Sequence, residues 1–383
     1  MSVAESRRYT RHSTQHRGLS YRERSDGQKT FYGLVDGRRM KLDAISLRDA
    51  VAEYGELRGK VAKGVKLPPA KVRFADAAEA WYATTEHLRP WTRIQYRATL
   101  DNELLPRFGK RRLREIQLDH VLAYIRTLSA RGLSRSTIES YLLPLSGTFK
   151  HAMRTGLASS NPCLLLDKRR DIPTDKTKST AHEWSDTEIQ NLLKASELIA
   201  RQPASRYDYT PLIKVAIGTG LRLGELLGLQ WQDIELDNTV LLVQRQYSRT
   251  GELAPPKTPK AIRRVPLTPD LAALLRRHRL SSKLSQDSDF VFASRTGGPL
   301  LHRNVQRRGF EVARDLAEIP KTVTFHDLRH AFASIAAHRG VPVGVLSAVM
   351  GHRDVGVTQG VYMHLYNRDA AEDDFRTAMT GAL

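Results

Sequence analysis

The sequence predicts a mainly α-helical chain with small β-sheets, an α+β fold divided among three domains. Apolar residues recur at helical spacing through residues 72–158 and through much of residues 184–383. Short alternating segments, separated by Asp-Gly pairs, occupy residues 18–43, and further strand-like segments lie within residues 239–267. The length of 383 residues is sufficient for two or three domains of ordinary size.

The first domain is expected over residues 1–66. Residues 1–16 are polar and basic, and we expect them to be disordered. The two Asp-Gly pairs that follow are turn signals between three short strands of an antiparallel sheet. Ser46 is then placed to cap a helix that extends to about Val61.

The second domain is expected over residues 72–158 as a compact module of four helices. Pro144 lies inside the fourth helix and is expected to kink it. Residues 159–183 are rich in Pro, Lys and Thr, which is typical of an inter-domain linker. The third domain, residues 184–383, then begins with a Ser-x-x-Glu capping box and is mostly helical.

The charge of the chain indicates a polyanionic partner. Its formal net charge is +20, and residues 1–180 hold 35 Lys and Arg against 19 Asp and Glu. Nucleic acid or an acidic membrane surface is the natural partner for such a chain. No apolar run is long enough to span a membrane. Cys163 is the single cysteine, which excludes an internal disulfide and a cysteine-based zinc site and fits a reducing, cytosolic compartment.

Four separated motifs hold the candidate site residues. Each has an ordinary interpretation alone, such as a surface ion pair, a solvated lysine or a half-buried core tyrosine. The motifs are TGLRLGELLGL with Arg222 and Glu225, PPKTPKAIRRVPL with Lys257, TFHDLRHAFASIAAHRG with His326, Arg329 and His330, and VMGHRDVGVTQGVYMHL with His352 and Tyr362.

Two of these motifs predict local chemistry from spacing. Glu225 lies one helical turn after Arg222, where its carboxylate can hold the guanidinium in one orientation. Thr324 is expected to be the N-cap of a helix, with Asp327 completing a capping box. Two histidines and an arginine beside a helix N-terminus are typical of an anion site.

Together, the four motifs resemble the pattern of the tyrosine recombinase (phage integrase) family. The shared features are the order Arg, Lys, His-x-x-Arg, His, Tyr and the flanking words TGLR-x-GE, PKT, HDLRH, GH and T-x-x-x-Y-x-H. The resemblance extends to residues 72–158, which look like the helical, SAM-like core-binding domain of that family. More weakly, residues 18–61 resemble the arm-binding domain of phage and mobile-element integrases. Met350 departs from the family pattern, in which Leu usually precedes Gly-His, and packing should tolerate this exchange.

The resemblance implies a nucleophile and two proton-transfer groups. Tyr362 would attack the scissile phosphate of DNA to give a 3′-phosphotyrosine and a free 5′-hydroxyl. His326 would help to take the tyrosine proton, and Lys257 would protonate the departing 5′-oxygen.

It also implies how the phosphate charge is stabilised. Arg222 and Arg329 would contact the non-bridging oxygens, because a guanidinium offers a fork of donors and stays charged. His352 would add a hydrogen bond, and Glu225 and His330 would support the site. No metal ion and no cofactor are expected, because preorganised positive charge takes their place.

The resemblance therefore implies a site-specific recombinase that integrates or excises a mobile element. The expected partners are double-stranded DNA at core and arm attachment sites, further copies of the chain in a tetramer on DNA, and accessory DNA-bending or directionality factors. We expect no membrane partner and a location in the cytoplasm with the nucleoid. Two alternatives are a type IB topoisomerase, disfavoured by the arm-like domain, and a non-catalytic DNA-binding regulator, disfavoured by the complete set of site residues.

Overall fold

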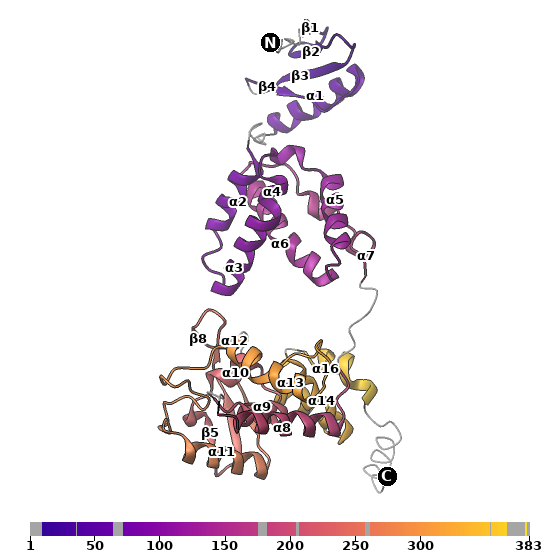
Figure 1. Ribbon diagram of the computed structural model, residues 1–383. Coiled ribbons are helices and arrows are strands. Elements are labelled where there is room, and N and C mark those ends of the chain that lie inside the picture. The colour runs from indigo at the N-terminus through magenta and orange to yellow at the C-terminus, as the bar shows by residue number, and fades with distance from the viewer. Residues whose placement is uncertain are drawn as a thin grey trace, which may run out of the picture. The chain divides into compact units, whose positions relative to one another are not determined.

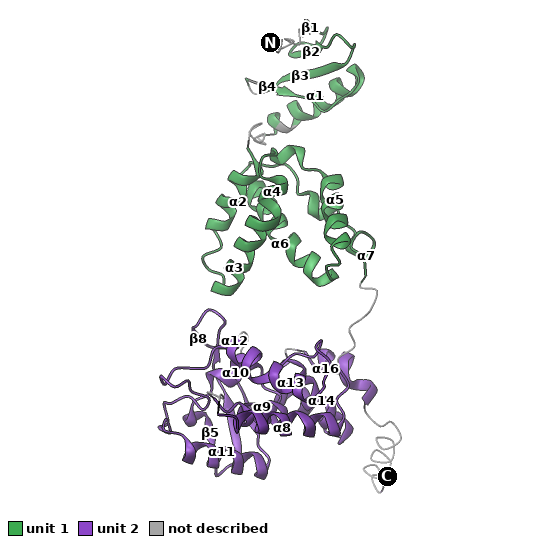
Figure 2. Ribbon diagram, viewed as in Figure 1, with its two compact units in different colours: residues 1–178 green, residues 179–383 purple. Residues whose placement is uncertain are grey.

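The computed structural model describes residues 10–35, 37–63, 72–174, 182–203, 207–256, 261–352, 354–365 and 380 (Figure 1). Contacts between residues divide the chain into two compact units, Met1–Lys178 and Ser179–Leu383 (Figure 2). Helices dominate both units and the sheets are small, which confirms the predicted α+β class. None of the helices in these described ranges is both long and apolar enough to cross a membrane.

The first unit begins with a four-stranded antiparallel sheet in the order β1-β2-β3-β4. The strands are β1 (Thr10–Ser13), β2 (Leu19–Glu23), β3 (Lys29–Val35) and β4 (Arg38–Lys41), and helix α1 (Leu47–Ala62) follows. As predicted, the Ser46 hydroxyl caps α1 by accepting the Asp49 backbone N–H at 3.2 Å. The buried core of this region consists of Leu19, Phe31, Val35, Leu42, Ala50 and Tyr54.

The expectation that residues 1–16 are disordered is wrong for β1, and the sheet has four strands instead of three. β1 carries no apolar side chain, so its composition resembles that of a polar tail. Its order comes from the backbone ladder with β2 and from His12, whose ring stacks on Tyr21 with centroids 4.8 Å apart.

The helical module of the first unit packs around one apolar core. Its helices are α2 (Phe74–Ala83), α3 (Pro90–Thr99), α4 (Leu105–Phe108), α5 (Leu118–Ala130) and α6 (Arg135–Arg154), and a π-turn at Leu100–Leu104 makes α3 and α4 continuous. Helix α6 continues beyond the buried Pro144 to its end at Arg154.

The linker is shorter than predicted. Residues 161–172, which were expected to belong to it, form a 3-10 turn (Pro162–Leu165) and helix α7 (Lys168–Asp171). Ile172 is fully buried in the core of the helical module. The Arg135 guanidinium donates to the carbonyls of Lys168 at 2.7 Å and Ile172 at 2.9 Å, which ties this segment to α6.

Within the described residues, the second unit contains nine α-helices and two small sheets. Its helices are α8 (Asp186–Ala200), α9 (Thr210–Thr219), α10 (Leu223–Gly228), α11 (Pro269–Ser281), α12 (His302–Asn304), α13 (Glu311–Leu316), α14 (Asp327–His338), α15 (Val343–Met350) and α16 (Val355–Tyr362). One sheet has the order β5-β6-β9, from Ile234–Glu235, Val240–Val243 and Arg263–Pro266, and the other pairs β7 (Gln246–Tyr247) with β8 (Leu253–Ala254). The predicted capping box of α8 is present, with Ser185 and Glu188 each accepting the backbone N–H of the other.

Candidate active site

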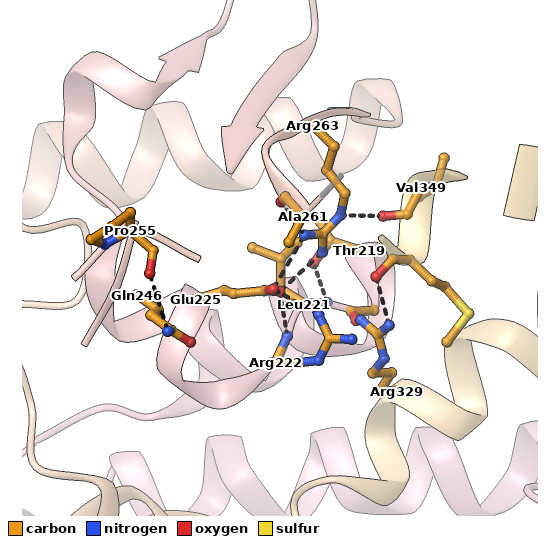
Figure 3. Close-up of polar contacts among 12 residues, drawn as sticks. Thr219, Leu221, Arg222, Glu225, Gln246, Pro255, Ala261, Arg263, Arg329 and Val349 are labelled. Carbon is orange, nitrogen blue, oxygen red and sulfur yellow. Dashed lines mark hydrogen bonds and ion pairs between the residues drawn. The ribbon is translucent and has the colours of Figure 1, made fainter. Parts of the chain in front are cut away.

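The carboxylate of Glu225 lies at the centre of the first part of the site. Helix α9 ends at Gly220 in the left-handed conformation, and Arg222 then precedes α10, which places Glu225 in its first turn. Figure 3 shows the Glu225 carboxylate between the guanidinium groups of Arg222 and Arg263. Glu225 is only 3% exposed, and Arg222, whose Nη1 donates to it at 2.9 Å, is 40% exposed. The Arg222 side chain therefore remains partly accessible to a ligand.

The ionisation of Glu225 depends on its two arginines. Burial by itself would raise the pKa of this carboxyl, but hydrogen bonds and charge from Arg263, together with the charge and backbone N–H of Arg222, bring it below its ordinary value. The carboxylate is thus negative at neutral pH and orients both guanidinium groups.

Arg329 connects three of the four motifs. It lies in the first turn of α14 and is 4% exposed. Its Nη1 donates to the carbonyl of Gly220 and its Nη2 to the carbonyl of Met350, both at 2.6 Å. Burial and the nearby charge of Arg222 lower the pKa of Arg329 to about 9, so the guanidinium is still charged at neutral pH. This bonding brings the segments before Arg222 and before His352 together around one cation.

The start of α14 differs from the predicted capping box. Thr324 donates to the Asp327 carboxylate from its backbone N–H at 2.8 Å and from its hydroxyl at 2.7 Å. These bonds close a turn ahead of the helix, which begins at Asp327, so His326 and not Thr324 occupies the N-cap position. The extra turn places Arg329 in the first helical turn, where it faces Gly220.

Tyr362 lies at the end of α16 with its hydroxyl against a histidine. The side chain is 3% exposed, and its hydroxyl oxygen is 2.5 Å from Nδ1 of His330. His326, which we expected beside the tyrosine, packs its ring edge-on against the His330 ring, with centroids 5.6 Å apart. Burial raises the pKa of Tyr362 to about 12, and the charge of Arg329 opposes this rise. His330 is therefore the direct partner of the tyrosine in this structure.

His352 is oriented by the helix that carries the tyrosine. It follows Gly351, which ends α15 in the left-handed conformation. Its Nδ1 lies 2.7 Å from the hydroxyl of Thr358, a fully buried residue of α16. Burial, with the charges of Arg329 and Arg222, lowers the pKa of His352 to about 4, so its imidazole is neutral at pH 7. In the tautomer in which Nδ1 accepts from the Thr358 hydroxyl, the neutral ring carries its proton on Nε2, which can then donate to a ligand.

Lys257 lies outside the described residues, in the gap at 257–260, and its role remains a prediction. The groups of His, Cys, Asp and Glu within the described residues form no set of three that could hold a metal ion. The site that is described consists of cationic and neutral hydrogen-bond donors around Arg329, with a tyrosine beside them. Such an arrangement suits a phosphate with a developing negative charge.

Comparison with known proteins decides the family. A model of the phage integrase family matches residues 184–368, and a model of the phage integrase central domain matches residues 74–169. The chain belongs to the tyrosine recombinase (phage integrase) family. It is accordingly a site-specific recombinase enzyme, and the topoisomerase and regulator alternatives are not favoured.

Several relatives of this tyrosine recombinase match most of its length. A XerC-like tyrosine recombinase of Caldanaerobacter subterraneus subsp. tengcongensis is 26% identical, over 83% of this chain and 86% of the relative. The transposase of transposon Tn916 from Enterococcus faecalis is 24% identical, over 85% of this chain and 81% of the relative.

Solved structures show the same fold. The integrase of transposon Tn1549, in complex with transposon right end DNA, is 20% identical with a TM-score of 0.68, covering 80% of this chain and 99% of that one. A lambda integrase tetramer bound to a Holliday junction is 18% identical with a TM-score of 0.58, covering 90% of this chain and 95% of that one.

Two residues of the recombinase site were not singled out as site residues from the sequence. Arg263 forms the second ion pair of Glu225, and Thr358 binds His352. The alternation of β9 offered a signal for Arg263, because it shares a strand face with the buried Val265, whereas Arg264 points outward. An arginine on the inward face of a strand requires a buried partner. Thr358 is the Thr of the flanking word T-x-x-x-Y-x-H, one turn before Tyr362, but the sequence assigned it no contact.

Proposed function

We propose that this recombinase cuts and rejoins double-stranded DNA through a 3′-phosphotyrosine on Tyr362, and so integrates or excises a mobile element. The observation that carries the proposal is the position of the Tyr362 hydroxyl. The hydroxyl is within hydrogen-bond distance of His330 Nδ1, and the charge of Arg329 acts on it. Arg329 in turn donates to the carbonyls of Gly220 and Met350, in the segments that carry Arg222 and His352. A nucleophile and the groups that stabilise a phosphate thus meet at one place.

In the proposed reaction, Arg222, Arg329 and His352 bind the scissile phosphate. A bond forms between the Tyr362 oxygen and phosphorus as the bond from phosphorus to the 5′-oxygen breaks. The phenol proton leaves to a neighbouring base, and Lys257 supplies a proton to the 5′-oxygen. The free 5′-hydroxyl of a second strand then reverses these steps, so no nucleotide cofactor is consumed.

We assign the phenol proton to His330, in place of the His326 expected from the sequence. His330 Nδ1 is within hydrogen-bond distance of the phenol oxygen, and burial lowers the pKa of His330 below its ordinary value of about 6.5. The ring is therefore neutral at pH 7 and can accept a proton. The His326 ring contacts the His330 ring, and the His330 ring in turn contacts the ring of Tyr362.

The pH dependence of strand cleavage tests this assignment. A general base contributes about 10²–10⁴ in rate. His330→Ala should lose roughly that factor at pH 7, and its rate should then rise with pH up to about pH 8, because hydroxide replaces the missing base. Over the same range, which lies below the Arg329 pKa of about 9, the wild-type rate should stay flat. Covalent adduct formation on a nicked duplex carrying the core site gives these rates.

His326→Ala is the matched control for that experiment. It removes an imidazole from the same turn of the same helix but leaves the hydrogen bond to Tyr362 in place. Its pH profile should remain flat from pH 7 to about pH 8, as for the wild type. A steep profile for His326→Ala together with a flat one for His330→Ala would return the base role to His326.

Residues 1–66 are proposed to bind the arm sites through the sheet face that α1 does not cover. Arg22 and Arg39 lie over the Tyr32 ring, at 5.5 and 4.6 Å from its centroid. Partial burial and the charges of Arg11 and Arg22 lower the pKa of Arg39, so these three arginines lie close together on this face of the sheet. A basic, aromatic face on a small sheet is well suited to the phosphates and grooves of duplex DNA.

Replacing Arg22 and Arg39 together by Ala should weaken recombination of full attachment sites and leave cleavage of an isolated core site unchanged. Each lost phosphate contact should reduce the salt slope of arm-site binding by about one. The control is the double variant Arg48→Ala, Lys63→Ala. It also removes two positive charges, but from helix α1 (Arg48) and from the residue that follows it (Lys63). Equal loss of arm-site affinity in both double variants would mean that bulk charge, not this face, binds the arm.

The helical module and the second unit are each proposed to bind the core site, and four copies of the chain to assemble on two DNA segments. Two strands of each duplex must be cut, and each tyrosine cuts one, so one synapse requires four tyrosines. Accessory DNA-bending or directionality factors and action on nucleoid DNA belong to the same proposal.

A further inference from the structure

Arg263 is a buried cation that the reaction described above does not use. It is the first residue of β9, and its side chain is 5% exposed. We propose that Arg263 is a positioning residue for strand cleavage, which acts through Glu225 on Arg222 and through the backbone ahead of His352. The inference rests on the proposed function, because it concerns the same site.

The hydrogen bonds of Arg263 show that its guanidinium has almost no capacity left for a ligand. Nη2 donates to Glu225 Oε2 at 2.9 Å, and Nη1 donates to Glu225 Oε1 at 3.2 Å and to the Ala261 carbonyl at 3.0 Å. Nε donates to the Val349 carbonyl at 2.5 Å. Four of the five N–H groups of the guanidinium are thus engaged within the protein. Arg263 cannot bind the phosphate as Arg222 and Arg329 can.

Glu225 is saturated in the same way. Each oxygen accepts one bond from Arg263 and one from Arg222, whose backbone N–H donates to Oε2 and whose Nη1 donates to Oε1, both at 2.9 Å. The carboxylate can therefore rotate only if both arginines move. Arg263 fixes the carboxylate, and the carboxylate fixes the position of Arg222.

Arg263 also sets the charge that Arg222 presents. With Arg222 alone, Glu225 would form a neutral pair, and a guanidinium neutralised by a buried carboxylate stabilises a phosphate poorly. With Arg263 present, two cations share one anion, and the three residues together keep a net charge of +1. The exposed member of the three is Arg222, so this charge is directed toward the ligand.

The hydrogen bond from Arg263 to the Val349 carbonyl connects Arg263 to the fourth motif, which carries His352. Val349 lies near the end of α15, next to Met350, whose carbonyl accepts from Arg329. Gly351 follows, and a Cβ there would lie 3.0 Å from Arg263 Cδ, so the arginine packs directly against the turn that presents His352. One side chain thus connects the positions of Arg222 and His352.

A double-mutant cycle separates this role from simple structural support. The probe is a nicked duplex carrying the core site recovered from the junction of the excised element, and the readout is the rate of covalent adduct formation at saturating protein. Arg263→Met should lower this rate about 100-fold, because displacements near 1 Å at a reacting group have effects of that size. The Kd for the duplex should change far less than the rate, since Arg263 does not itself face the ligand.

Two further variants carry the decisive comparison. The adduct rate of Arg263→Lys should lie between those of the wild type and Arg263→Met. Lysine keeps the positive charge, which Met loses, but it lacks the fork of donors of arginine. Glu225→Gln in the Arg263→Met background should raise the adduct rate roughly tenfold above that of Arg263→Met, because the net charge of +1 returns and the single amide oxygen can still accept one of the two bonds from Arg222. A merely structural role predicts the opposite, a double variant slower than either single one.

Arg245→Met serves as the stability control. Arg245 pairs with the fully buried Asp233 at 2.7 Å and belongs to none of the four motifs, so this variant should lower Tm and keep the adduct rate. An Arg263→Met rate equal to wild type, or a double variant slower than both single ones, overturns the inference. If the wild type forms no adduct, or Tyr362→Phe forms as much, the proposed function itself fails, and that result is distinct from the first.

Discussion

Tyr362→Phe is expected to abolish the covalent protein–DNA adduct and to leave specific DNA binding intact. The substitution removes only the attacking hydroxyl, and the ring remains packed among the buried residues of α14, α15 and α16. The hydroxyl has one described partner, His330, so the loss of stability should be limited to one hydrogen bond, about 1 kcal/mol. Denaturing electrophoresis after incubation with a nicked core-site duplex measures the adduct.

Tyr209→Phe is the matched control for this experiment. Tyr209 precedes α9 and is also a tyrosine whose pKa burial raises, but it belongs to none of the motifs of the site. It should form adduct at the wild-type rate. Adduct that persists in Tyr362→Phe at the wild-type level would show that another residue is the nucleophile.

Arg329→Lys is expected to have a large effect on strand cleavage. Removing one preorganised donor from a developing charge costs about 10²–10³ in rate, and lysine cannot reproduce the two bonds to Gly220 and Met350. The substitution should lower the rate of strand cleavage and disturb the arrangement of the motifs that bond to Arg329. The variant should therefore lose adduct formation by at least that factor at saturating DNA.

Arg314→Lys separates lost stability from lost catalysis. Arg314 is likewise buried and donates to two carbonyls, those of Lys321 at 3.1 Å and Val323 at 3.0 Å. Both variants should lower Tm, but only Arg329→Lys should lose cleavage by orders of magnitude. Parallel losses of stability and cleavage in the two variants would mean that Arg329 acts only through folding.

The sequence predicted the helical periodicity, the sheets and most helix starts, because these depend on local chemistry such as the Ser46 and Ser185 caps. It failed at β1, where the ladder to β2 and not the composition creates the strand. It also failed for the segment before Ile172, whose burial depends on packing against the helical module.

The site was predictable as a set of residues but not as a set of contacts. His326 and His330 are one helical turn apart, so spacing alone gives both the same face of α14. Which of them meets Tyr362 depends on how α16 packs on α14, and that is a tertiary property. Arg263 and Glu225 are likewise far apart in the chain, and their ion pair depends on the tertiary packing of β9 and α10.

Peptide mapping of the covalent adduct is the most direct test of whether Tyr362 becomes linked to the 3′-phosphate of the cleaved strand. The adduct formed on the nicked duplex in excess chelator would be digested with protease and nuclease and analysed by mass spectrometry. We expect a nucleotide 3′-phosphate on the peptide that contains Tyr362, and a free 5′-hydroxyl on the released strand. A modified peptide that lacks Tyr362, or a phosphate left on the 5′ end of the released strand, would contradict the account.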